Sequence, residues 1–206
     1  MFYVYGIGAS LMRSVRRRAN VVGWFTVSAP DNDSYMCGSR DVLDPIIAGI
    51  PMCHACGFKT DSSFVNHEFR LKCVDYDLSY TYDGYAIASA KFASIVASNG
   101  LTGASFVRLP ASPGFFLLIA ESTVEFDIAR RQTRFDAWCP VCERYASVAG
   151  ATPAFLRRPP VADIARTDVE FGSGNERQPL LIASTRAKEA IACGAVRGPE
   201  FSAVAV

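Results

Sequence analysis

Alternation of apolar and polar positions with a period of two is the commonest pattern along this chain, and it predicts short β-strands. In residues 69–73 the alternation places Phe69, Leu71 and Cys73 on one face. Further strands are predicted at residues 85–88, 106–107, 123–128 and 167–171, and in the segment that leads from Phe135 through Trp138 into Cys139. Residues 28–40 are rich in turn-forming residues and predict a loop.

One segment changes from alternation to helical spacing. Ser89 is a good N-cap, and Phe92, Ile95 and Val96 then recur with the period of a helix. The dipeptide Asn99-Gly100 predicts the end of that helix. The segment is therefore predicted to be a strand, a Ser-capped helix, a glycine turn and a second strand.

The C-terminal segment repeats this order of residues at one constant offset, without gaps. The matched positions are Ile87-Ala88-Ser89 with Ile182-Ala183-Ser184, Ala97 with Ala192, Gly103 with Gly198, and Phe106 with Phe201. We infer an internal repeat, in which each half of the chain holds one cysteine pair followed by one β-α-β unit. Chance similarity between two amphipathic β-α-β pieces is the alternative.

Together these patterns predict an α+β protein with mixed or antiparallel sheets and a few helices. Residues 1–44 are expected to form an N-terminal arm. Residues 45–206 are expected to form one domain of two collinear β-α-β-containing halves, roughly 45–112 and 113–206, joined by a split four-cysteine, zinc-ribbon-like site. In the arm, Arg13, Arg16 and Arg17 would share one face of a helix, with Arg18 to the side, and we interpret them as a solvated face.

Composition and charge narrow the classes of function. The 206 residues are half apolar, which allows a sizeable core, and the formal net charge is only +1. Such a balance creates no strong field for nucleic acid or an anionic membrane surface. No apolar run is long enough for a transmembrane helix, and the N-terminal segment lacks the order of a secretory signal. We therefore expect a cytoplasmic protein with no membrane partner and no nucleic-acid partner.

Four of the seven cysteines form two CxxC pairs, Cys53 with Cys56 and Cys139 with Cys142. In a reducing compartment such pairs are more often metal-binding or catalytic than structural disulfides. Cys73 and Cys193 stand in apolar patterns and are expected to be buried. Cys37 lies in a polar stretch, and its sequence context assigns it no role.

The four paired cysteines are the candidate metal ligands, and zinc is the expected ion. Two CxxC turns supply four thiolates, which suits tetrahedral zinc. Gly57 follows the first pair, where a thiolate turn favours a residue with positive φ, whereas Glu143 stands at that place in the second pair. Lys59 and Arg144 would offset the negative charge of a tetrathiolate site. His54 and His67 are expected to be exposed rather than ligands.

Two other functions remain open on the sequence. A thiol-disulfide enzyme could use Cys139 and Cys142, because the residues after them could open a short helix whose dipole lowers a thiol pKa. A zinc-ribbon nucleic-acid module is disfavoured by the near-neutral charge. The sequence contains no HExxH, GxSxG, P-loop or GxGxxG motif, so no enzymatic chemistry is expected.

The sequence resembles the bacterial double-CXXCG motif proteins. The resemblance rests on "CHACG" early in the chain, on "CPVC" after an alternating strand, and on the closing "LLIASTRAKEAIACGAVRGPEF", and it covers residues 45–206. It maps the family's cysteines to Cys53, Cys56, Cys139 and Cys142. The glycine of the family's first motif corresponds to Gly57, whereas Glu143 stands in place of the glycine of the second motif. Some members are regarded as immunity proteins that neutralise a cognate toxin. The resemblance thus implies a zinc-stabilised, non-catalytic protein whose partner is another protein, such as a toxin.

Overall fold

The computed structural model describes residues 23–39, 42–47 and 49–206. Its strands are β1 (Trp24–Ser28), β2 (Leu78–Tyr80), β3 (Ala86–Ser89), β4 (Ala104–Arg108), β5 (Phe115–Ala120), β6 (Ser122–Val124), β7 (Arg134–Cys139), β8 (Arg144–Ala149), β9 (Ile164–Ser173), β10 (Gln178–Ser184) and β11 (Glu200–Val204). Its helices are α1 (Ala90–Ser98), α2 (Ile128–Arg131) and α3 (Thr185–Cys193), with a 3-10 turn η1 (Gly174–Glu176). The predicted basic face of Arg13, Arg16, Arg17 and Arg18 lies outside the described residues.

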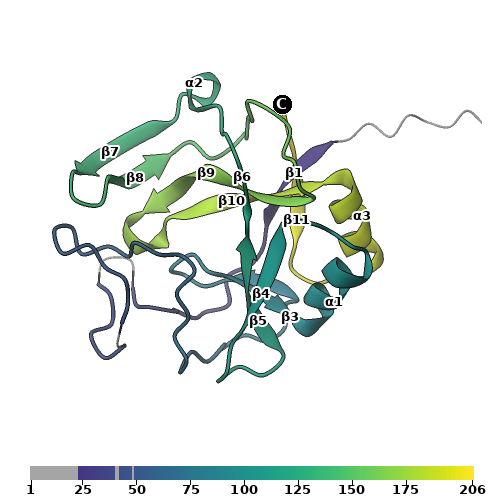
Figure 1. Ribbon diagram of the computed structural model, residues 1–206, viewed down its shortest axis with the longest axis horizontal. Helices are drawn as coiled ribbons and strands as arrows, with labels where there is room; N and C mark the ends of the chain where they lie inside the picture. Colours follow the sequence, from purple (N-terminus) through teal and green to yellow (C-terminus); the bar gives the residue numbers. More distant parts are fainter. Residues whose placement is uncertain (1–22, 40–41, 48) are drawn as a thin grey trace, which may run out of the picture.

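Two sheets form the body of the protein, which confirms the predicted α+β class. The larger has seven strands in the order β11-β1-β10-β9-β8-β7, with β6 added parallel to β9. The smaller has four antiparallel strands in the order β2-β3-β5-β4. Figure 1 shows α1 and α3 next to each other on the side of the molecule opposite the β7–β8 hairpin. None of the helices in the described part of the chain has the length and apolar character needed to cross a bilayer.

The internal repeat is present in the structure as two matching units, β3-α1-β4 and β10-α3-β11. Ser89 and Ser184 cap the two helices in the same way, each hydroxyl accepting the N–H of the residue three positions later. Both capping residues have almost the same backbone angles, with φ −74° and ψ 164° at Ser89 and φ −71° and ψ 164° at Ser184. The helices contain 9 residues each. The capping signals therefore predicted α1 and α3 correctly.

In each unit a third strand lies between the two strands of the unit. β5 lies between β3 and β4 in the smaller sheet, and β1 lies at the matching place between β10 and β11 in the larger one. β1 comes from residues 24–28, which the sequence placed in the N-terminal arm. The predicted division at residue 44 therefore does not follow an edge of the sheet.

A buried contact between the units recurs at the two equivalent glycines. Gly103 and Gly198 both have positive φ, 88° and 112°. The backbone carbonyl of Ile164 stands so close to Gly103 that a Cβ there would lie 2.1 Å from its oxygen. At Gly198 the carbonyl of Leu78 plays the same role at 2.2 Å. Each glycine thus lets one unit approach the first residue of the strand that precedes the other unit, β9 or β2.

Two aspartates, Asp77 beside the start of α1 and Asp163 beside the start of α3, each join their helix to the opposite unit. Asp77 accepts hydrogen bonds from the Ser89 hydroxyl at 2.7 Å and from the Arg197 N–H at 2.9 Å, and Lys91 lies 3.4 Å away. At the matching place, Asp163 accepts from Ser184 at 2.9 Å and pairs with Arg186 at 2.9 Å. Burial raises the pKa of Asp77, but the Arg197 N–H, the Ser89 hydroxyl and Lys91 outweigh it, so this pKa lies below 3.8.

We expect Asp77→Asn to lower the free energy of unfolding by about 2 kcal/mol at pH 7, because it weakens a charge-assisted hydrogen-bond network. A carboxyl with a depressed folded pKa stabilises the protein above its unfolded pKa, and this contribution is lost as the pH falls through the folded pKa. The difference between the two proteins should therefore shrink as the pH falls below about 3.8. Urea unfolding at pH 7 and pH 3 measures this, and a difference that stays the same at both values would contradict it.

Three features predicted from alternating or apolar patterns are wrong. Residues 69–73 form no strand, because their N–H groups bond elsewhere: Leu71 to the Ser112 hydroxyl, Lys72 to the Ser34 hydroxyl and Cys73 to the Asn32 carbonyl. Cys73 is half-buried and Cys193 is exposed, so neither is a core residue.

Cys37 belongs to neither CxxC pair, and it is fully buried. Its thiol lies 3.1 Å from the Tyr85 hydroxyl, and its N–H donates to the carboxylate of the buried Asp83. The Asp83 carboxylate also accepts the Met36 N–H, so one acid organises the stretch that the sequence predicted as a simple loop. This burial raises the pKa of the Cys37 thiol to about 11.

Candidate metal centre

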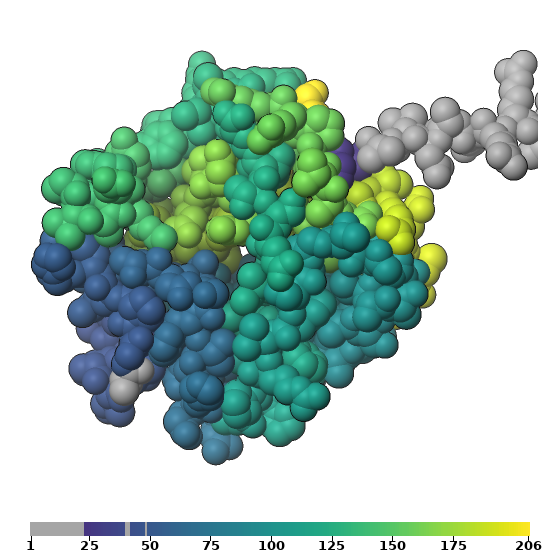
Figure 2. Space-filling view, in the orientation of Figure 1, coloured from purple at the N-terminus to yellow at the C-terminus, as the bar shows by residue number. Residues whose placement is uncertain are grey.

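The two CxxC pairs lie in two matching hairpin turns. The second turn joins β7 to β8, where Trp138 pairs with Tyr145 and Cys139 with Arg144. The first turn is closed by a single bridge between Met52 and Lys59, the positions that correspond to Trp138 and Tyr145. Figure 2 shows the segment around residues 50–60 directly against the β7–β8 hairpin. The repeat therefore brings together two turns that are far apart in the chain.

The four cysteine sulfurs meet between the turns. The Sγ atoms of Cys53 and Cys139 are 3.8 Å apart, those of Cys56 and Cys142 are 3.7 Å apart, and all four lie within 4.8 Å of one another. A tetrahedral zinc ion with Zn–S bonds of about 2.3 Å requires S···S distances of about 3.8 Å. Four sulfurs in this arrangement could hold a metal ion such as zinc. Among the described residues, no other group of three or more potential ligands comes together in this way.

Glu143 adopts the conformation that the metal turn requires. Its φ is 54°, and Gly57 at the equivalent place in the first turn has φ 75°. Both residues are thus in the left-handed region, where a side chain costs about 1–2 kcal/mol relative to glycine. The departure from the CXXCG pattern leaves the shape of the second turn unchanged and adds backbone strain.

We expect opposite effects from exchanging these two residue types. Gly57→Ala should lower the free energy of unfolding by about 1 kcal/mol, whereas Glu143→Gly should raise it by up to about 1 kcal/mol. No atom lies within 4 Å of a Cβ placed at Gly57, so the first change tests backbone conformation alone. Urea unfolding of metal-loaded protein measures both. Equal destabilisation by the two variants would show that Glu143 does more than tolerate the turn.

Backbone N–H groups inside each turn favour the thiolate form of the first cysteine. The N–H groups of Cys142 and Val141 lower the pKa of Cys139 to about 7, and those of Cys56 and Ala55 lower the pKa of Cys53. Burial raises the pKa of the second cysteine of each pair, to about 12 at Cys142. Metal ligation requires all four thiolates, so an ion would have to displace the protons of Cys56 and Cys142.

The surroundings of the sulfurs include a buried arginine that the sequence did not single out. Arg177 is 5% exposed, and its side chain donates to the carbonyls of Gly174 and Tyr145. Burial lowers its pKa, while Glu170 and the nearby Cys142 and Cys56 act in the opposite direction. Arg177 thus places a positive charge near the candidate site.

Of the two expected cations, only Arg144 links the halves across this region. It donates to the Thr60 carbonyl at 2.8 Å and lies 3.5 Å from Glu170. Lys59 is buried and turned toward the Asp83 carbonyl and the Tyr85 ring, whose centroid is 4.2 Å from its Nζ. Both histidines, His54 and His67, are exposed, as predicted.

The η1 turn holds the first cysteine turn in place. Asn175, which is fully buried, accepts the Lys59 N–H at 2.8 Å and donates to the Ser39 carbonyl at 3.2 Å. The hairpin that contains this turn is much longer than its counterpart: β9 and β10 have 10 and 7 residues, against 3 and 4 in β2 and β3. The polar stretch "GSGNERQP" signals this extension, but nothing in it predicts contact with the cysteines.

No protein-family model matches the chain, and no curated protein is significantly similar to it. The chemistry of the site is therefore inferred from the arrangement of its four sulfurs. Four thiolates would fill a tetrahedral shell and leave no open position for a substrate or a reactive water. This arrangement suits a structural metal ion.

Proposed function

We propose that the protein is a non-catalytic binding protein whose two halves are joined by one structural zinc ion at Cys53, Cys56, Cys139 and Cys142. The convergence of the four sulfurs at tetrathiolate distances carries this proposal. Because the pairs come from different halves, a bound ion would connect them with four strong bonds. The ion's role would be to fix the β7–β8 hairpin relative to the first half.

The surface that this ion would fix is aromatic and exposed. Trp138 is 50% and Phe135 36% exposed, and both rings lie against Tyr145, with centroids 4.8 Å and 4.9 Å away. Residues 135 and 138 would point to opposite faces of a regular strand. Ala137, with φ 53°, interrupts the alternation between them. This interruption lets both rings share one face.

We define Phe135, Trp138 and Tyr145 as the aromatic patch, and propose that it anchors a protein partner. Tryptophan and tyrosine are enriched among the residues that dominate binding energy at protein interfaces. β7 is also the last strand of its sheet, and five of its six residues are exposed. A partner strand could pair with this open edge while its side chains pack on the patch.

The class of partner is proposed from the family resemblance. "CHACG" and "CPVC" resemble the motifs of double-CXXCG proteins, although Glu143 replaces the second motif glycine, and some of those proteins are regarded as toxin-neutralising. We therefore propose a toxin domain as the partner, and the cytoplasm as the compartment, where free thiolates persist for metal binding.

Co-expression with the product of the adjacent gene tests the binding role. We expect a stable complex whose dissociation constant rises about 30-fold or more in Trp138→Ala, corresponding to about 2 kcal/mol at a central aromatic residue. Val161→Ala is the matched control, because Val161 is 96% exposed on a different segment. A neighbour that is neither toxic alone nor bound by this chain would remove the support for an immunity role.

A further inference from the structure

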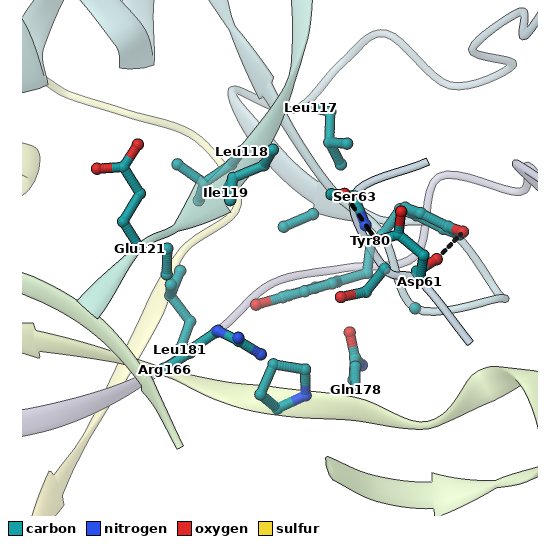
Figure 3. A pocket seen from close by; sticks show the side chains of 16 residues that line it. Asp61, Ser63, Tyr80, Leu117, Leu118, Ile119, Glu121, Arg166, Gln178 and Leu181 are labelled. Atoms are coloured by element: carbon teal, nitrogen blue, oxygen red, sulfur yellow. Dashed lines mark hydrogen bonds between the residues drawn. The ribbon is translucent and has the colours of Figure 1, made fainter. Parts of the chain in front are cut away.

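A cavity of about 270 Å³ opens between the two sheets, separate from the cysteine site (Figure 3). One wall comes from the small sheet, with Tyr80 on β2 and Leu118 on β5. The other comes from the large sheet, with Arg166 on β9 and Gln178 and Leu181 on β10. Volumes near 300 Å³ are typical of the smaller ligand sites in proteins.

Tyr80 faces into this cavity without a partner. Tyr80 is only 9% exposed, and its hydroxyl takes part in none of the hydrogen bonds between the described residues. In Figure 3 its ring crosses the cavity, with the hydroxyl end directed toward the side where Arg166 lies. Burial raises the pKa of this phenol, so it stays a neutral hydrogen-bond donor. The hydroxyl is not among the fully buried atoms that lack a partner, so it can be reached from the cavity, and a ligand atom there would accept its O–H.

Arg166 is a half-buried cation with no counter-ion among the residues that the structure describes. This separates it from Arg144, Arg157 and Arg186, each of which lies within 3.5 Å of a carboxylate. Figure 3 shows the Arg166 guanidinium at the cavity, while the carboxylate of Glu121 points away from it. A partly desolvated guanidinium is stabilised by an anion that can accept two parallel N–H bonds.

Gln178 adds a third polar group without a partner, and this one is a hydrogen-bond acceptor. Its Oε1 atom is buried and has no hydrogen-bond partner in the described structure. Figure 3 shows this side chain rising from β10 into the cavity. An amide oxygen can only accept, so its partner must be a donor. Apolar side chains, including Leu118 and Leu181, line the space between the polar groups.

We propose that this cavity binds a small organic carboxylate that has an apolar body and one hydrogen-bond donor. Arg166 and the Tyr80 hydroxyl would bind the carboxylate, Gln178 would accept from the donor, and the leucines would cover the apolar body. Tyr80 and Arg166 occupy matching places in the strands that precede the two repeat units, each two residues after the strand start, at Leu78 in β2 and at Ile164 in β9. At this pair of matching positions the repeat has diverged, so that one wall of the cavity has the neutral Tyr80 and the other the cationic Arg166.

Calorimetric titration of the metal-loaded, full-length protein with 4-hydroxyphenylacetate tests the site. This probe carries a carboxylate, an aromatic body and a phenolic donor. We expect saturable binding with a dissociation constant below about 1 mM, and at least about tenfold weaker binding of tyrosol, which has an alcohol in place of the carboxylate. Arg166→Met should weaken binding of the carboxylate by about tenfold or more, Arg166→Lys by less, and Tyr80→Phe should also weaken it.

Arg158→Met is the control, because Arg158 is exposed and does not line the cavity. It should leave the dissociation constant unchanged. Thermal unfolding of each variant separates loss of the fold from loss of the site. Absence of saturable binding in folded protein, or equal affinity in wild type and Arg166→Met, overturns the proposal. The partner proposal at β7–β8 has a different readout, so either can fail alone.

Discussion

Cys53→Ser is expected to abolish binding of one zinc ion per chain and to lower the free energy of unfolding by about 4 kcal/mol or more. Structural zinc contributes about 10–16 kcal/mol in zinc-finger peptides at pH 7, and we expect most of this to depend on a complete ligand set. The present chain also has a large core, so the variant should be weakened rather than unfolded. For a chain of this length, the melting temperature should fall by about 10 °C or more.

Metal analysis and calorimetry of protein made without added zinc measure both effects. Cys193→Ser is the matched control, because Cys193 is exposed and lies outside the four-sulfur group. It should change neither the zinc content nor the melting temperature. Fully folded, metal-free protein whose Cys139 and Cys142 exchange disulfides would contradict the zinc proposal and favour the thiol-disulfide alternative.

Gly198→Ala and Gly103→Ala should each cost about 3 kcal/mol or more in the free energy of unfolding. The new Cβ would stand 2.2 Å and 2.1 Å from the carbonyl oxygens of Leu78 and Ile164. These are backbone atoms at the starts of β2 and β9, so they cannot move without displacing a strand. Positive φ at both glycines adds about 1 kcal/mol of strain.

Gly114→Ala separates the two causes. Gly114 has φ 85°, close to that of Gly103, but no atom lies within 4 Å of a Cβ placed there. It should cost only about 1 kcal/mol, from backbone conformation alone. Urea unfolding of the three variants makes the comparison. If all three lose the same free energy, the close approach between the units contributes nothing.

The features that the sequence predicted correctly depend on local signals or on the repeat. Helices α1 and α3 were predicted because Ser89 and Ser184 are N-caps followed by helical spacing. The four cysteines were grouped because two CxxC turns recur in a duplicated architecture. For each helix a short stretch of sequence contains the whole signal. For the cysteines the signal lies in two short stretches, each of which is a CxxC turn.

The features that were missed depend on partners far along the chain. Cys37 is buried because Asp83 binds the backbone around it, and the strand predicted at residues 69–73 is absent because hydroxyl groups of Ser34 and Ser112 bind its N–H groups. Arg177 reaches the cysteine site only through the longer β9–β10 hairpin. Alternation and composition contain no information on such distant contacts, so a single sequence could not predict them.

The place of β1 in the large sheet has a consequence for synthesis of the protein on the ribosome. Trp24 pairs with Ser184 on one side and with Val204 on the other, so this strand leaves the ribosome long before either neighbour exists. The small sheet needs nothing beyond Ala120 and can form early. Until β10 and β11 have been made, β1 is an unpaired apolar segment that is open to pairing with other chains. The nascent protein is therefore exposed to aggregation through β1 during the whole interval between the synthesis of β1 and that of β10 and β11.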